Sequence, residues 1–312
     1  MSIATAILSL QQAKADIASA IEDQGVDTTG HGLADYATDI KEIKSGGSEE
    51  MENLLLKTIS AIISDADDTD LTDEVLNLAD IGTLTVKRLR PYAFAGIQFQ
   101  EVILPPAGSA SYTEIPSNCF TGSTVTDIVI PEGITTIGNN AMSNCFRLSN
   151  VSLPSTLTAL QSSVFSSTPI TDITLPQGLL TIGTSCFASS GLTKLSIPNS
   201  VTEAGNNMCS GATSLVTTKI RCAKLGSSSL SGVYKNCSSL KYVWISADCT
   251  TILGSNANNA PFAGCGSLAE FYCEANNKPS GWSQFWNYGV GGALTVHWGT
   301  TEEQFDAIVS QA

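Results

Sequence analysis

The sequence predicts a solenoid in which short parallel strands stack as the rungs of a continuous sheet. Prolines that follow an apolar-x-apolar pair recur at intervals of 26, 23, 22 and 22 residues, and an Ile-Gly pair or a related pair follows several of them. A fixed period of this length is typical of repeat architectures. Since one repeat cannot bury its apolar face alone, each repeat must cover the next. The prolines are Pro105, Pro131, Pro154, Pro176 and Pro198.

Each repeat begins with a short predicted strand. Apolar residues alternate there with Thr, Ser or Asp, which places the apolar side chains on the face toward the core. The proline suits the end of such a strand, where its missing N–H costs no ladder hydrogen bond. The apolar pairs are Ile128/Ile130, Val151/Leu153, Ile173/Leu175 and Leu195/Ile197.

A second apolar segment follows each proline, and we expect its glycine to permit a tight bend. Five residues beyond the first residue of the pair stands another bulky side chain. Stacking of the repeats turns these side chains into an internal ladder. The pairs are Ile137-Gly138, Ile182-Gly183 and Ala204-Gly205. The predicted ladder members are Phe94, Phe120, Met142, Phe165, Phe187 and Cys209.

A resemblance to the BspA-like class of leucine-rich repeats is carried by the stretch VTDIVIPEGITTIGNNAMSNCFRLSNVSLPSTLTALQSSVFSS. Units of that class run as a strand and proline, an Ile-Gly pair, and an Ala-Phe-x-x-Cys-x-x-Leu segment. The resemblance implies a leucine-rich-repeat solenoid over residues 84–275, with residues 51–83 as its N-terminal cap. The fold class is then β-rich and α+β overall. Such arrays are binding and display scaffolds, so the fold alone names no ligand.

The nine cysteines follow the repeat rather than a metal-binding pattern. Cys119 and Cys186 directly precede ladder positions, and others stand three residues before a leucine. Small buried side chains are the simplest interpretation. No Cys-x-x-Cys pair occurs and only His31 and His297 are available, so the sequence predicts no metal and no cofactor. The cysteines that precede a leucine are Cys145, Cys237 and Cys265.

Residues 1–44 predict a separate helical module. Apolar residues recur there at a 4-3-4-3-4 spacing, which is a heptad seam interrupted by one lysine. Short helices of this kind need a partner, so the module is either a helical hairpin or a coiled coil for oligomerisation or docking. The polar stretch KSGGSEE places a flexible hinge at residues 45–50. The seam consists of Ile3, Ile7, Leu10, Ile17 and Ile21.

The stretch LQQAKADIASAIEDQGVDTTGHGLADYATDIKEI resembles the short N-terminal module of many phage tail-fibre and related virion proteins. This resemblance implies a non-enzymatic virion protein of tail-fibre, receptor-binding or decoration type, which adheres to a host-surface protein or glycan. It also implies a homo-oligomer, with a trimer favoured, or docking to another virion protein through the N-terminal helices. There are two alternatives. The first is a bacterial surface adhesin that interacts with a host, and the second is a glycan-active enzyme.

Composition limits the partners and the location. A net charge of −14 without a Lys/Arg cluster argues against nucleic acid as a partner. No apolar run approaches the roughly 18 residues of a membrane span, so no membrane insertion is expected. The N-terminus lacks the basic segment and the apolar core of a signal peptide. We therefore expect synthesis in a host cytoplasm and assembly into a virion, with the bacterial cell surface as the alternative.

No catalytic constellation stands out in the sequence. No frame of the acidic stretch DADDTDLTDE supplies both the glycine at the sixth position and the acid at the twelfth position of an EF-hand loop. Neither a phosphate-binding loop nor a nucleophile elbow occurs. We expect no enzyme, although a carboxylate pair for glycan cleavage stays open as an alternative.

The C-terminal segment, residues 276–312, is rich in aromatic residues. Five aromatic residues lie in a stretch of 17 residues, whereas only 7% of the whole chain is aromatic. They form either a cap over the open end of the core or an exposed contact surface for a sugar or a protein. The sequence TTEEQFDAIVSQA predicts a final helix capped by Thr301. The aromatic residues are Trp282, Phe285, Trp286, Tyr288 and Trp298.

Overall fold

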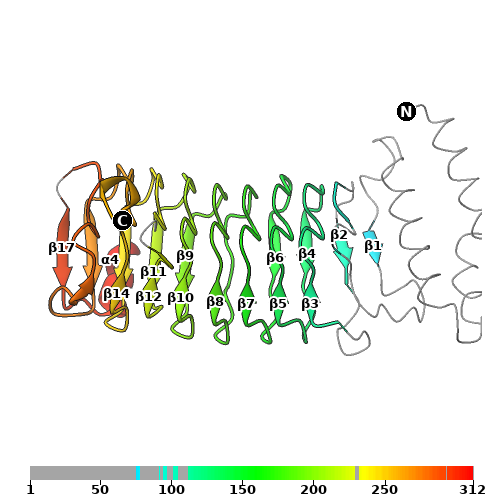
Figure 1. The fold of residues 1–312 in the computed structure, drawn as a ribbon, viewed down its shortest axis with the longest axis horizontal. Coiled ribbons are helices and arrows are strands. Elements are labelled where there is room, and N and C mark those ends of the chain that lie inside the picture. Colours follow the sequence, from blue (N-terminus) through cyan, green and yellow to red (C-terminus); the bar gives the residue numbers. More distant parts are fainter. Residues whose placement is uncertain are drawn as a thin grey trace, which may run out of the picture.

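A computed structural model describes residues 75–77, 91, 94–96, 101–104, 112–228, 232–292 and 294–311. Over these residues the chain forms a solenoid whose turns follow one another along the long axis of the molecule (Figure 1). Every strand pairing among the described residues is parallel and joins strands of successive turns. The predicted fold class is therefore confirmed.

The N-terminal predictions fall outside the described residues. This applies to the helical module at 1–44, to the hinge at 45–50 and to the cap at 51–83, apart from a strand at 75–77. The seam of Ile3, Ile7, Leu10, Ile17 and Ile21 stays a prediction.

The first face of the solenoid holds the strands that begin each repeat. It consists of a 4-stranded sheet and a 5-stranded sheet. In the 4-stranded sheet the strands are β1 (Val75–Asn77), β2 (Glu101–Ile103), β4 (Asp127–Val129) and β6 (Asn150–Ser152). In the 5-stranded sheet they are β9 (Lys194–Ile197), β11 (Thr217–Ile220), β13 (Tyr242–Ile245), β15 (Glu270–Cys273) and β17 (Thr295–Trp298).

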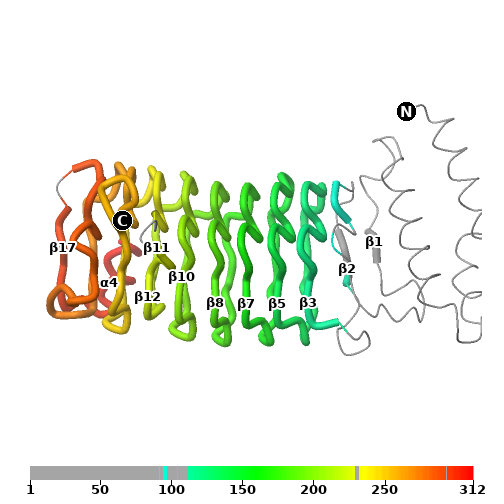
Figure 2. The backbone as a smooth tube through the Cα atoms, viewed as in Figure 1, coloured from blue at the N-terminus to red at the C-terminus, as the bar shows by residue number. Residues whose placement is uncertain are grey.

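The second face is one continuous 8-stranded sheet of two-residue strands. Its strands are β3 (Glu114–Ile115), β5 (Thr136–Ile137), β7 (Ala159–Leu160), β8 (Thr181–Ile182), β10 (Glu203–Ala204), β12 (Lys224–Leu225), β14 (Thr251–Ile252) and β16 (Gly281–Trp282). The described residues also contain the 3-10 helix η1 (Ala257–Asn259) and the helix α4 (Glu302–Val309). The backbone tube in Figure 2 shows the turns side by side.

The parallel rungs continue beyond residue 275, where we expected the repeats to give way to a cap. The strand β16 pairs with β14, and β17 pairs with β15, in the same parallel arrangement as the earlier turns. Part of the aromatic C-terminal segment is therefore the last part of the solenoid itself.

The apolar side chains of all turns meet in one core, and the predicted ladder runs through it. Each predicted ladder residue is at most 2% exposed. Phe94 stacks on Phe120 with ring centroids 5.1 Å apart, and Phe165 stacks on Phe187 at 5.7 Å. The ladder extends beyond the predicted members, because Tyr234 stacks on Phe262 at 5.5 Å.

Backbone hydrogen bonds continue from turn to turn through the segments that carry the ladder. Phe120 donates its N–H to the carbonyl of Ala141 at 2.7 Å, and Phe165 donates to Cys186 at 2.8 Å. These segments need left-handed backbone, with Asn118 at a φ of 59° and Ser163 at 58°. Asn adopts this region more readily than most residues. The turns are therefore rich in small polar residues and glycine.

The glycines of the Ile-Gly pairs permit close contact between turns, not the bend that we expected. A Cβ at Gly183 would lie 2.5 Å from the backbone carbonyl carbon of Gln161, and a Cβ at Gly205 would lie 2.5 Å from that of Gly183. Neither glycine has a positive φ. Since no side chain tolerates such distances, a larger residue there would push neighbouring turns apart.

All nine cysteines are buried and unpaired, as the repeat positions predicted. The thiols that precede a leucine bind the carbonyl of a ladder residue in the turn before. Cys145 donates to the carbonyl of Phe120 at 2.9 Å, and Cys237 donates to that of Cys209 at 3.1 Å. Each such cysteine therefore adds a second hydrogen bond to a carbonyl that already accepts a backbone N–H, while filling a small space in the core.

We predict that Phe187→Ala lowers the free energy of unfolding by about 3–5 kcal/mol, because it removes a buried ring from the ladder. Phe146→Ala is the matched control, since that ring is 71% exposed and its loss should cost less than about 0.5 kcal/mol. Equilibrium denaturation measures both changes. Equal losses of stability would contradict the assignment of inner and outer faces.

We also predict that the cysteine thiols of the native protein react slowly with alkylating reagents. Burial raises the pKa of Cys119 and of Cys186, which keeps both thiols protonated and unreactive near neutral pH. A maleimide should therefore label the native protein slowly and label every cysteine once denaturant is added. Mass spectrometry without reductant reads the result, and either rapid native labelling or defined disulfides would refute the prediction.

Candidate binding surface

The first face presents two columns of outward-pointing side chains along the solenoid. Strands such as β9 alternate exposed and buried residues, so every second side chain points away from the core. The parallel register then aligns outward positions of successive strands, as for Asp127 with Asn150 and Lys194 with Thr217. Toward the N-terminal end the outward side chains are polar, apart from Val129, which is 60% exposed. The polar ones include Asp127, Asn150, Ser152, Asp172 and Thr174.

One turn interrupts this face. We predicted a strand at Ile173/Leu175, and the prediction was wrong, because the segment Asp172–Leu175 is not part of either sheet. Within the described chain, no backbone hydrogen bond joins these four residues to β6 or to β9. Thr193 still donates its N–H to the carbonyl of Thr171 at 3.0 Å. The interruption therefore begins just after Thr171.

A proline stands immediately before the interruption. In the following turn, Gly191 donates its N–H to the carbonyl of Thr168 at 2.9 Å. The corresponding residue one turn earlier is Pro169, which has no N–H to donate to the turn before it. Pro169 therefore marks the turn in which Asp172–Leu175 separates from β6, although the paired turns of β6 and β11 also lack the bond that Gly191 makes.

The separation opens the core on the side of β6. Inward-pointing residues of the neighbouring strands are buried, with Ile128 at 2% and Leu195 at 3% exposure. Val151 and Leu153 occupy equivalent positions in the turn of β6 but are only partly buried. Their exposure places the opening between β6 and the segment Asp172–Leu175.

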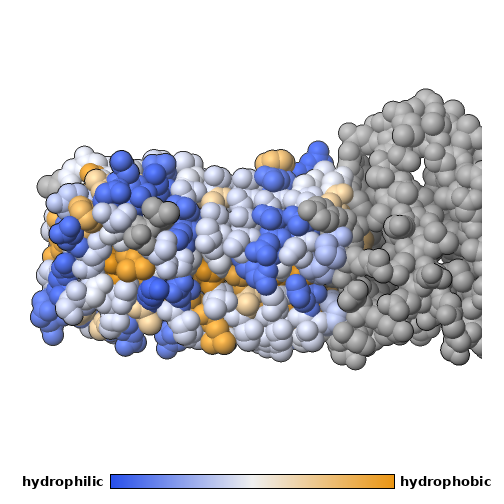
Figure 3. Space-filling model, viewed as in Figure 1, coloured by the Kyte–Doolittle hydropathy of each residue, from blue (hydrophilic) through white to orange (hydrophobic). Residues whose placement is uncertain are grey.

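A groove of about 1090 Å³ lies over the opening. This volume is at the upper end of the range for small-ligand sites. Its apolar lining includes Val151, Leu153 and Ile173, and its acidic lining consists of Asp127, Glu132 and Asp172. None of its lining residues is Lys, Arg or aromatic. The visible face of the solenoid in Figure 3 is mostly hydrophilic or neutral, with hydrophobic residues confined to small areas.

The carboxylates of the groove are held in place by neighbouring turns. Glu132 accepts hydrogen bonds from the backbone N–H and the hydroxyl of Ser155, both at 2.9 Å. These bonds hold the pKa of Glu132 below its ordinary value. Asp172 forms an exposed ion pair with Lys194 at 2.9 Å. The groove therefore carries negative charge at neutral pH.

The helix α4 covers another part of the same face. Thr301 caps it as predicted: its hydroxyl accepts the N–H of Gln304 at 3.3 Å, and the Gln304 side chain accepts the N–H of Thr301 at 2.9 Å. Phe305 is fully buried and packs with Trp244 and Tyr272. We expected this helix over the open end of the core. It lies on the outer side of the strands instead, because β13 and β15 present aromatic side chains there.

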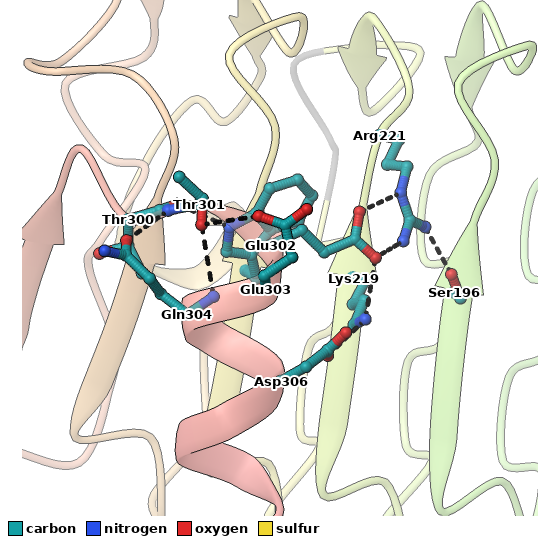
Figure 4. A network of polar contacts seen from close by, with 10 residues as sticks. Ser196, Lys219, Arg221, Thr300, Thr301, Glu302, Glu303, Gln304 and Asp306 are labelled. Carbon is teal, nitrogen blue, oxygen red and sulfur yellow. Dashed lines mark hydrogen bonds and ion pairs between the residues drawn. The ribbon is translucent and has the colours of Figure 1, made fainter.

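Ion pairs fix the first turn of α4 to β11 (Figure 4). Glu302 accepts hydrogen bonds from Lys219 at 2.9 Å and from the Nε of Arg221 at 3.0 Å. Partial burial raises the pKa of Glu302, but the hydrogen bonds from Arg221 and Lys219 outweigh it and lower the pKa overall. Lys219 also contacts Asp306 at 2.5 Å. The groove near β6 therefore lies in a part of the first face that α4 leaves uncovered.

The five aromatic residues predicted from the sequence as a cap or a contact surface are buried to different degrees. Trp282 and Trp286 are 3% and 5% exposed and belong to the core. Trp298 is partly buried against them, with ring centroids 6.0 Å and 6.4 Å away. Phe285 packs edge to face with Tyr288, which is 51% exposed. Tyr288 is thus the exposed member, and Phe285 and Trp298 are partly exposed.

The remaining candidates for chemistry lie at the C-terminal end. His297 contacts Glu270 at 2.5 Å and stacks on Tyr272 with ring centroids 4.7 Å apart. In the part of the chain that the structure describes, no group of three or more His, Cys, Asp or Glu residues could hold a metal ion. No helix in that part has the length and apolar character to cross a bilayer. His31 lies outside the described residues.

The groove was not among the sites expected from the sequence. Its residues fit the repeat pattern as well as those of any other turn, so the pattern predicts an unbroken sheet. The available signal was Pro169, because none of the neighbouring repeats has a proline at that position. Pro169 by itself does not predict the interruption, because strands pair in other turns without the bond that Gly191 makes to Thr168.

Residues 113–232 match the family model described as a BspA type leucine rich repeat region, in 6 copies. Among curated proteins, none matches the sequence significantly.

Solved leucine-rich repeat proteins are similar to the chain at low identity. The protein from T. pallidum is 22% identical, with 55% of this chain and 77% of that chain covered and a TM-score of 0.41. The protein from Bacteroides ovatus is 19% identical, with 72% and 75% covered and a TM-score of 0.37. The protein from Eubacterium ventriosum is 18% identical, with 69% and 71% covered and a TM-score of 0.40.

We predict that Phe305→Ala detaches α4 from the first face, because the helix has a single fully buried side chain in this contact. The substitution should remove about 3–5 kcal/mol of the free energy that holds α4 on the strands, which is enough to expose the helix to hydrogen exchange and proteolysis. Ile308→Ala is the control, since Ile308 is 39% exposed. Hydrogen exchange measured by mass spectrometry compares the two variants, and unchanged protection of α4 in Phe305→Ala would show that the ion pairs alone hold the helix.

Proposed function

We propose that this chain, whose residues 113–232 are BspA-type leucine-rich repeats, is a non-enzymatic adhesion protein that binds a surface protein or glycan through its groove. The observation that carries the proposal is the opening beside β6. It combines a volume of about 1090 Å³ with partly exposed apolar residues and a polar rim, on the part of the first face that α4 leaves uncovered. Ligand sites typically combine these properties.

The chemistry of the groove favours binding over catalysis. A glycosidase needs two carboxyl groups on either side of the bond that it cleaves, one of them with a raised pKa. In this groove the pKa of Glu132 is lowered, and Asp172 is exposed and paired with Lys194. His297, the histidine that the structure describes, lies away from the groove in β17. These arrangements suit recognition of a ligand without its conversion.

The bacterial surface adhesin fits the repeat type better than the phage virion protein. Evidence for the virion hypothesis is confined to the sequence of residues 1–44, which the structure does not describe. A homo-oligomer, with a trimer favoured, and docking to another virion protein rest on the same residues and stay predictions. The proposal of a binding groove holds for either location, because the groove is built by residues 127–178 alone.

The experiment is to measure binding of the labelled full-length chain to arrays of host-surface proteins and glycans. Ser152→Trp and Thr174→Trp place a bulky side chain in the groove at exposed positions. We expect each variant to weaken binding by roughly tenfold or more, because the added ring fills the site. The matched control is Ser255→Trp, at an exposed position outside the groove.

Equal binding by all three variants would place the contact elsewhere and refute the proposed role of the groove. If Tyr288→Ala also weakens binding to the arrays, Tyr288 and Phe285 at the C-terminal end contribute to the contact. Conversion of any arrayed glycan by the purified chain would refute the non-enzymatic assignment.

A further inference from the structure

The interruption of the first face leaves β6 with a free edge. On its other side β6 is paired with β4: Asn150 donates to the carbonyl of Thr126 at 3.1 Å, and the carbonyl of Ser152 accepts from Ile130 at 2.9 Å. Backbone groups of consecutive strand residues point to alternate sides. The N–H and carbonyl of Val151, and the N–H of Leu153, therefore point toward the groove.

The facing segment is also free. In the described chain, the backbone groups of Asp172, Ile173, Thr174 and Leu175 form no backbone hydrogen bond to either neighbouring turn. Elsewhere on the first face the sheet continues to the end of the solenoid through β9, β11, β13, β15 and β17. The groove thus has backbone donors and acceptors along two extended stretches of chain.

We propose that the groove binds an extended basic peptide, which adds a strand to the free edge of β6. The proposal deepens the proposed function and rests on it, since it names the class of ligand for the same groove. An added strand would satisfy the backbone groups of Val151 and Leu153 in the way that each turn satisfies the next. Strand addition to an exposed sheet edge is a recurring mode of peptide recognition.

The inner lining of the groove is apolar and its outer lining is acidic, so the two linings determine which peptide side chains would fit. Residues that point inward would meet Val151, Leu153 and Ile173, so they should be apolar. Residues that point outward would lie near Asp127 and Asp172, so they should be basic. Because strand side chains alternate between faces, the ligand should alternate apolar and basic residues.

A peptide fits the groove better than a glycan does. Sugar rings are commonly bound against aromatic side chains, and none of the residues that line this groove is aromatic. The lining includes three carboxylates, and Lys194 outside it pairs with one of them, Asp172, at 2.9 Å. The remaining negative charge of Asp127 and Glu132 favours a cationic ligand over a neutral one. Free backbone edges add directional donors and acceptors that match another backbone.

The test uses the full-length chain and a short fluorescent peptide that alternates lysine and valine. Fluorescence anisotropy should show saturable binding. Methylation of the backbone nitrogens that face β6 should weaken binding by about tenfold or more, because it removes ladder hydrogen bonds. The double variant Asp127→Asn, Asp172→Asn should weaken it by about threefold to thirtyfold. Asp248→Asn, at an exposed position outside the groove, is the control and should change nothing.

Equal binding of the methylated and unmethylated peptides would overturn strand addition. Saturable binding of a neutral oligosaccharide, blocked by Ser152→Trp, would overturn the peptide in favour of a glycan and leave the proposed function intact. Peptide binding that obeys the predictions, together with surface adhesion that is insensitive to Ser152→Trp, would refute the proposed function while the peptide site stands. Absence of peptide binding in a chain that still adheres through the groove would refute only the present inference.

Discussion

Contact between the backbones of successive turns is the constraint on which this structure depends. Where turns approach most closely, as between Gly183 and Gln161, no Cβ can be accommodated. The same spacing stacks Phe165 on Phe187 and brings the thiol of Cys145 to the carbonyl of Phe120. Each turn therefore supplies both the hydrogen-bond partners and the apolar cover of the next, which is why a solenoid is stable only as an array.

At the groove, the backbones of two successive turns lose this contact on the first face. Pro169 has no N–H to donate, and the segment after it joins neither sheet of the first face. The second face compensates, since β7 and β8 remain paired and the ladder segments stay hydrogen-bonded between the same turns. Separation on one face alone therefore opens a groove without breaking the solenoid.

The helix α4 divides the first face into a covered part and an open part. Its contact with β13 depends on outward aromatic side chains such as Trp244, and its first turn depends on the pairing of Glu302 with Lys219 and Arg221. Around β6 the outward positions are polar apart from Val129, which is 60% exposed, so such a helix would find no aromatic side chains to pack on. The uncovered part includes the groove with its negative charge and free backbone edges, on which the proposal of a basic extended ligand rests.

The sequence by itself determined the solenoid, the inward position of the ladder residues and the buried free cysteines, because each depends on a local pattern repeated at a fixed interval. It also determined the Thr301 cap, which depends on a single local capping box. Only the tertiary structure decided the rest. Ile173 and Leu175 have the pattern of a strand yet form none, since strand formation also requires a partner at hydrogen-bonding distance in the next turn. Trp282 and Trp286 entered the core because parallel rungs continue beside them. Those outcomes depend on contacts between distant residues, which a repeat pattern does not specify.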